Sequence, residues 1–170
     1  MPEEDKFTEE SLGVPSKAEL KERLSSENVW QCTSEDSKGE KEEEFQAWLY
    51  THFQMTLENA LRLINREDVD ESRPFEFKYE GRAMIKQLLD ELQNQNDGKD
   101  SSAKELAKAI CLKYLGVTYM DCEELADSQE LLSQALKIFD NLALELKLRY
   151  LNDVVDCYNT IGIVHCNRGA

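Results

Sequence analysis

The sequence lacks the short motifs on which most enzyme chemistry depends. It contains no Gly-rich phosphate loop, no GxSxG nucleophile motif and no HExxH metal motif. The run of carboxylates at Glu42–Glu44 is better explained as the solvated start of a helix than as a catalytic pair. We therefore expect a protein that is not an enzyme and that needs no cofactor.

Histidine is scarce, which limits metal binding. His52 falls within a helical stripe and is expected to be a partly buried helix residue, whereas His165 stands next to Cys166. Adjacent positions on a helix point about 100° apart, so His165 and Cys166 cannot easily share one ion. None of the Cys-x2–4-Cys spacings of structural zinc sites occurs around Cys122 or Cys157. No metal site is expected.

Long apolar runs and paired cysteines are also missing. No run approaches the ~20 apolar residues that a membrane-spanning helix needs, and no apolar signal segment is found at the N-terminus. The cysteines are odd in number and form no CxxC pair, which is typical of reduced thiols in a cytosolic protein: Cys32, Cys111, Cys122, Cys157 and Cys166. We expect a cytoplasmic protein without membrane insertion.

Acidic residues, in contrast, are abundant. The 170 residues carry a formal net charge of −15. Nucleic acids and anionic membrane surfaces repel such a chain, so neither is expected as a partner. A basic protein surface is the favoured partner instead.

The chain divides into an acidic tail and a helical domain. Residues 1–44 are acidic, Ser-rich and poor in apolar side chains, so they are expected to be largely disordered. One short helix is possible at Ser16–Leu24, where Ser16 and Glu19 have the spacing of a capping box. Residues 45–170 carry helical periodicity and are long enough to form a core.

Two amphipathic helices open the domain. The first is expected over residues 41–65, where apolar residues recur at three- and four-residue steps: Phe45, Trp48, Leu49, Phe53, Leu57, Ala60, Leu61 and Ile64. Pro74 ends the polar break that follows and separates the two helices. The second is expected over residues 77–95, with these side chains facing inward: Tyr79, Ala83, Met84, Leu88, Leu89 and Leu92.

Three further helices follow. Residues 103–120 are so densely apolar that this helix is expected to be central and covered on more than one side. Asp121 suits the turn and the N-cap of the next helix, which should extend to about Ile138. The last helix should begin between Leu144 and Asn152 and run almost to the end. No β-alternation bounded by turn signals is seen, so the fold class is all-α.

A repeated pattern organises these helices. Leu112, Leu115, Gly116 and Tyr119 have the spacing of the first helix of a tetratricopeptide (TPR) repeat. The second helix of the repeat would contain Ser128, Leu132 and Ala135. A glycine inside a helix costs about 0.5–1 kcal/mol relative to alanine, and close packing of a neighbouring helix on Gly116 is the usual reason for it.

An incomplete second copy of the pattern lies near the C-terminus. It consists of Tyr158, Ile161, Gly162 and His165, and Gly162 lies 46 positions after Gly116, whereas about 34 would be expected of a standard repeat. A repeat cannot bury its apolar face alone. We therefore expect either an N-terminal fragment of a longer TPR-like α-solenoid of antiparallel helix pairs, or self-association through the exposed end.

Part of the sequence resembles the N-terminal region of the kinesin-binding protein family. The resemblance lies in a Leu-Gly-Val segment, an Asp-x-Glu-Glu-Leu segment and an Asn-x-hydrophobic-Gly-Ile segment, here Leu115–Val117, Asp121–Leu125 and Asn159–Ile163. Upstream, Lys78–Leu92 is similar to the preceding helix of the family, with Lys78, Tyr79, Arg82, Ala83 and Leu88 in register. The similarity covers residues 77–170, and the tail before Phe45 does not match.

The resemblance implies a non-enzymatic solenoid that binds kinesin motor domains, keeps them off microtubules and acts in microtubule-based transport, in the cytoplasm near the cytoskeleton. An acidic binder could compete with acidic tubulin for the basic face of a motor. The alternative is a generic TPR adaptor, such as a chaperone or assembly scaffold, with a different protein partner. An adaptor that grips acidic C-terminal peptides needs a cationic groove.

Generic repeat geometry gives the candidate partner-binding residues. The groove-facing positions of the first repeat helix would be Ile110, Lys113, Val117 and Met120, among which only Lys113 is cationic. The candidates for partner binding are Lys113, Met120 and Asn159. Each of them could equally be an ordinary helix-packing residue.

Overall fold

A computed structural model describes residues 40–95 and 102–169, with side chains from Glu43 onward. The described chain consists of helices and their connections, without a strand, which confirms the all-α class. The predicted tail spans residues 1–44: its residues 1–39, including Ser16–Leu24, lie outside the described residues, whereas residues 40–44 are helical and belong to the first helix of the domain. The elements are α3 (Glu40–Trp48), the π-helix η1 (Leu49–Phe53), α4 (Gln54–Ile64), α5 (Glu76–Asn94), α6 (Ser102–Asp121), α7 (Leu125–Asn141), α8 (Leu144–Arg149) and α9 (Leu151–Gly169).

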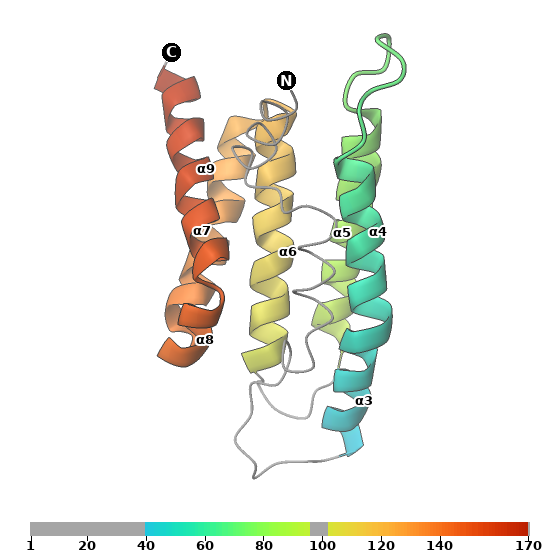
Figure 1. The fold of residues 1–170 in the computed structure, drawn as a ribbon, viewed down its shortest axis with the longest axis vertical. Coiled ribbons are helices and arrows are strands. Elements are labelled where there is room, and N and C mark those ends of the chain that lie inside the picture. Colours follow the sequence, from blue (N-terminus) through green and yellow to red (C-terminus); the bar gives the residue numbers. More distant parts are fainter. Residues whose placement is uncertain (1–39, 96–101, 170) are drawn as a thin grey trace, which may run out of the picture.

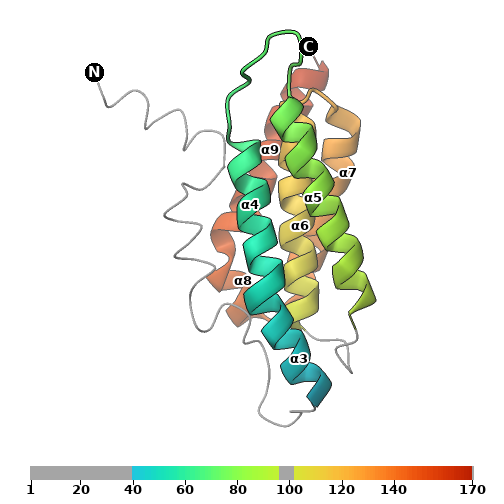
Figure 2. The same cartoon turned by 90° about the vertical axis from the view of Figure 1, so that its right-hand side faces the viewer.

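From α3 to α7 the helices pack in the order of the sequence. α3, η1 and α4 form one rod, α4 packs on α5, α5 on α6, α6 on α7, and α7 on α9, which also reaches α6. Figure 1 shows α6 in the centre, with α4 and α5 on one side and α7 and α9 on the other, and Figure 2 shows the same arrangement from the side. The central position explains why α6 is buried without a break from Ala109 to Thr118. The prediction of a central helix is confirmed.

The apolar stripe of the first helix is confirmed, although its backbone is not a plain α-helix. Phe45, Leu49, Phe53 and Leu57 are all buried. These residues are four positions apart, and such a spacing drifts about 40° per step around an α-helix of 3.6 residues per turn. The wider turn of η1 reduces the drift and keeps Phe53 over the core.

The expected inward face of α5 is partly wrong. Tyr79 and Ala83 are exposed, whereas Gly81, Arg82 and Ile85 are buried along with Leu88 and Leu92. The reason is the close approach of α4: a Cβ atom at Gly81 would lie 2.6 Å from Cγ1 of Ile64 and 2.8 Å from the carbonyl oxygen of Ala60. The contact face of α5 is therefore centred on Gly81.

The contact of α6 with α7 follows the repeat pattern. A Cβ atom at Gly116 would lie 2.6 Å from Cγ of Leu132, and the hydroxyl of Ser128 donates a hydrogen bond of 2.6 Å to the carbonyl oxygen of Gly116. The close packing expected at Gly116 is thus confirmed. The expected N-cap is wrong, because Asp121 is the last residue of α6 and Glu124 occupies the N-cap position of α7.

The C-terminal region contains two helices where one was expected. A break at Tyr150 separates the short helix α8 from α9, and Tyr150 is buried together with Leu146 of α8. α9 turns Val154, Cys157, Thr160 and Val164 toward the core. Its start at Leu151 lies within the predicted interval.

Candidate protein-binding surface

Lys113 does not face an open groove, so this part of the sequence prediction is wrong. Its side chain is 0 % exposed and belongs to a buried ion cluster between α6 and α9. Its ammonium group donates hydrogen bonds to Asp153 Oδ1 at 2.8 Å and to Asp156 Oδ2 at 3.0 Å. Both carboxylates come from the first two turns of α9, and they supply the charge that burial of a lysine requires.

The cluster keeps the lysine charged. Burial alone would lower the pKa of Lys113, but Tyr114 and the carboxylates of Asp153 and Asp156 outweigh this effect and raise the pKa above its ordinary value. Asp153 and Asp156 are also the only acidic residues of α9. Because both turn toward Lys113, the opposite side of α9 carries no carboxylate.

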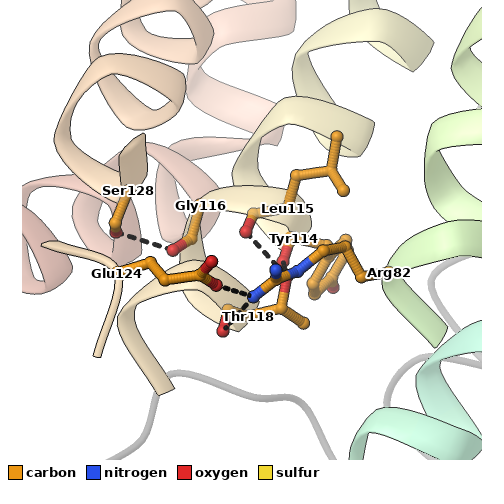
Figure 3. A network of polar contacts seen from close by, with 7 residues as sticks. All are labelled: Arg82, Tyr114, Leu115, Gly116, Thr118, Glu124 and Ser128. Carbon is orange, nitrogen blue, oxygen red and sulfur yellow. Dashed lines mark hydrogen bonds and ion pairs between the residues drawn. The ribbon is translucent and has the colours of Figure 1, made fainter. Parts of the chain in front are cut away.

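A second polar network connects α5 to the turn between α6 and α7 (Figure 3). The guanidinium of Arg82 is buried, lies 2.6 Å from a carboxylate oxygen of Glu124 and donates a hydrogen bond of 3.4 Å to the carbonyl oxygen of Thr118. It also stacks on the ring of Tyr119, with 3.7 Å between Cζ and the ring centroid. The network ties three consecutive helices together at one end of α6.

The main candidate surface is the outer face of α9, which we define as Leu151, Val155, Tyr158 and Gly162. The spacings of four, three and four residues place these positions on one side of the helix. Leu151 and Val155 are each 46 % exposed and Tyr158 is 57 % exposed. A Cβ atom added at Gly162 would meet no atom within 4 Å. Large apolar side chains exposed in one stripe are typical of a surface that binds protein.

The two other predicted partner-binding residues lie at different depths. Met120 is half-buried near the end of α6, whereas Asn159 is exposed on α9, next to Tyr158 of the outer face. Lys113, Met120 and Asn159 therefore do not share one surface. Partner binding through Met120 and Asn159 stays a prediction.

The histidines and cysteines serve separate local roles. His52 is exposed, unlike the expectation, and pairs with Glu91 across η1 and α5. His165 contacts Gln129 of α7. Cys111, Cys122 and Cys157 are buried free thiols, and Cys166 is an exposed one. Across residues 40–95 and 102–169, no three His, Cys, Asp or Glu side chains gather in a way that could hold a metal ion.

Within the same ranges, no helix is both long and apolar enough to span a membrane. Comparisons of the chain with protein-family models, with curated proteins and with solved structures give no match.

Proposed function

We propose that the chain is a non-enzymatic scaffold that binds other proteins. The observation that carries this proposal is the outer face of α9, a stripe of exposed apolar side chains on a chain with a net charge of −15. Exposed apolar stripes of this kind are unfavourable in water, and a protein partner relieves that cost.

The proposed architecture is a TPR-like α-solenoid of antiparallel helix pairs. Two observations support it. From α3 to α7 each helix packs on the next one along the chain, and the glycine contact between α6 and α7 lies in a pattern that recurs at Gly162 of α9. Stacked helix pairs with small residues at their contacts are the basis of such repeats.

The proposed partner is a kinesin motor domain, whose attachment to microtubules the protein would regulate in the cytoplasm near the cytoskeleton. The support comes from the resemblance at Leu115–Val117, Asp121–Leu125 and Asn159–Ile163, together with the acidic charge of the chain. A motor must present a basic surface to acidic tubulin, and an acidic protein is electrostatically complementary to that surface.

Co-sedimentation with microtubules tests this proposal. A kinesin motor domain is pelleted with microtubules in the presence and absence of the protein, at two salt concentrations. We expect less motor in the pellet when the protein is present, and a smaller effect at high salt because the attraction between charges is screened. An unrelated helical protein of the same net charge serves as the control. An unchanged pellet at low salt would contradict motor binding.

A generic TPR adaptor with another protein partner is the alternative. The burial of Lys113 argues against an adaptor that binds acidic C-terminal peptides. Lys113 is the only cation among the expected groove positions, and it is already paired with Asp153 and Asp156. Binding of an acidic C-terminal peptide to the chain, lost when the peptide is amidated, would favour the adaptor over the motor-binding protein.

A further inference from the structure

We propose that the outer face of α9 receives an amphipathic α-helix from another protein, and that α7 on α6 shows which side chains this helix must carry. The inference rests on the proposed protein-binding function and adds the surface and the chemistry of the partner.

α6 and α9 carry the same pattern of residues. Shifting by the 46 positions that separate Gly116 from Gly162 aligns Ala109 with Val155 and Leu112 with Tyr158. On α6, Ala109, Leu112 and Gly116 are all buried; on α9, all three equivalents are exposed. The same pattern is thus covered in the first copy and open in the second.

Two side chains of α7 cover Gly116. The side chain of Leu132 occupies the space into which a Cβ atom would project, and the hydroxyl of Ser128 donates to the Gly116 carbonyl oxygen. These two residues are four positions apart, so they lie on one side of α7. We therefore expect the partner helix to carry a leucine and, four positions earlier, a serine. The leucine would pack on Gly162, and the serine hydroxyl would donate to the Gly162 carbonyl oxygen.

The charges of α9 lie away from its outer face. The only two carboxylates of α9 bind Lys113 on its inner side, and Arg168 near its C-terminal end donates a hydrogen bond to Gln129 of α7. The outer face therefore offers apolar area without negative charge. As a partner, the outer face favours a helix with an apolar stripe. A basic protein surface suits the acidic remainder of the chain better than it suits this face.

Peptide binding to the complete chain tests the inference. The probe is a fluorescent peptide with the sequence of residues 124–142, which contains α7, and its binding is followed by fluorescence anisotropy. We expect saturable binding that weakens at least tenfold in Gly162→Leu, because the new side chain fills the position that leucine of the probe needs. In the free chain nothing lies within 4 Å of that position, so the substitution leaves the fold intact, which circular dichroism verifies.

Two controls make the result specific. Asn167→Leu adds the same side chain to an exposed position of α9 that points about 140° away from Gly162, and it should leave binding unchanged. A probe in which the leucine equivalent to Leu132 is alanine should bind at least tenfold more weakly. No binding of the original probe, or equal binding to Gly162→Leu, would overturn the inference.

Other occupants of the face are separate outcomes. Sedimentation equilibrium that shows self-association lost in Gly162→Leu would assign the face to a second copy of the chain. Amide NMR signals of residues 1–39 that shift in Gly162→Leu would assign it to the N-terminal segment. Either result would overturn docking of a foreign helix. The co-sedimentation assay contains no peptide, so motor binding stands or falls independently of all these results.

Discussion

Lys113 of α6 and Asp153 of α9 form an enclosed ion pair, with 2.8 Å between Nζ and Oδ1 and side-chain exposures of 0 % and 3 %. The pair connects two helices that are separated by all of α7 and α8 in the sequence. A buried charge is tolerated only with its partner, so each residue fixes the position of the other.

Removing the cation should destabilise the fold strongly. Lys113→Met removes the ammonium that pairs with the buried carboxylate of Asp153, and breaking a buried pair in this way costs about 3–5 kcal/mol. The double variant Lys113→Met/Asp153→Leu should recover much of the loss, since apolar side chains replace both charges. Urea unfolding measures all variants. Lys147→Met, which removes an exposed pair with Asp140, should cost at most about 1 kcal/mol. Equal losses in Lys113→Met and Lys147→Met would contradict the assigned role.

Gly116 and Gly162 should respond to alanine with opposite signs. Gly116→Ala places a methyl group 2.6 Å from Cγ of the buried Leu132, and we expect a loss of about 1–3 kcal/mol from overpacking. Gly162→Ala meets nothing and should stabilise the chain by about 0.5–1 kcal/mol through higher helix propensity. Thermal unfolding compares the two. A stabilising Gly116→Ala would show that α7 is not seated on α6 as described.

Arg82 should not be replaceable by lysine. Arg82→Lys keeps the charge but loses the flat guanidinium that stacks on Tyr119 and reaches both Glu124 and Thr118. We expect a loss of about 1–3 kcal/mol, mainly from the lost stacking on Tyr119, because Glu124 is partly exposed and the Thr118 carbonyl keeps its hydrogen bond from the Cys122 N–H. Lys86→Met is the control, since Lys86 is exposed and touches the same ring from 5.2 Å. The urea midpoint of Arg82→Lys should fall clearly below that of Lys86→Met, and equal midpoints would refute the stacking role.

The stability of the chain should fall in mild alkali. Burial raises the pKa of Cys157 from 9.0 to about 12, and it raises the pKa of Cys111 as well. The folded chain therefore holds protons that the unfolded chain loses above pH 9. Stability is fully present below pH 9 and decreases between pH 9 and about 12, by about 1.4 kcal/mol per pH unit for each thiol.

Urea unfolding at pH 8 and pH 10 checks this prediction. In Cys157→Ala the drop in stability between the two values should be smaller than in the unchanged chain, whatever the absolute loss from the cavity. Cys166→Ala, which removes an exposed thiol, should leave the drop unchanged. A drop of equal size in Cys157→Ala would contradict the assignment to this thiol.

Contacts between neighbouring helices could be predicted from local patterns. The spacing of Gly116, Ser128 and Leu132 indicated a close helix pair, and these three residues are in contact. The stripe from Phe45 to Ile64 likewise indicated which side of the first rod faces the core. Both predictions succeeded because side-chain periodicity within a helix directly encodes the side that is covered.

Contacts between distant charges could not be predicted in this way. Generic repeat geometry predicts that Lys113 faces a groove. It gives no information on the partners Asp153 and Asp156, which lie 40 and 43 positions away in the sequence. One signal was available: a single lysine within the dense apolar run from Ile110 to Val117 is more consistent with a paired, buried group than with an exposed one. Arg82 was similarly missed, because its partners are at the far end of α6.

The sequential packing of the helices also bears on the order in which the chain folds. Since the helices from α3 to α7 each pack mainly on a sequence neighbour, most contacts need only short loops to close, and such topologies fold rapidly. The Lys113–Asp153 pair is different, because it must wait for α9 to be complete. Until then Lys113 remains hydrated, so docking of α9 is the step at which this part of α6 is desolvated, and it should be the folding step most affected by loss of either charge.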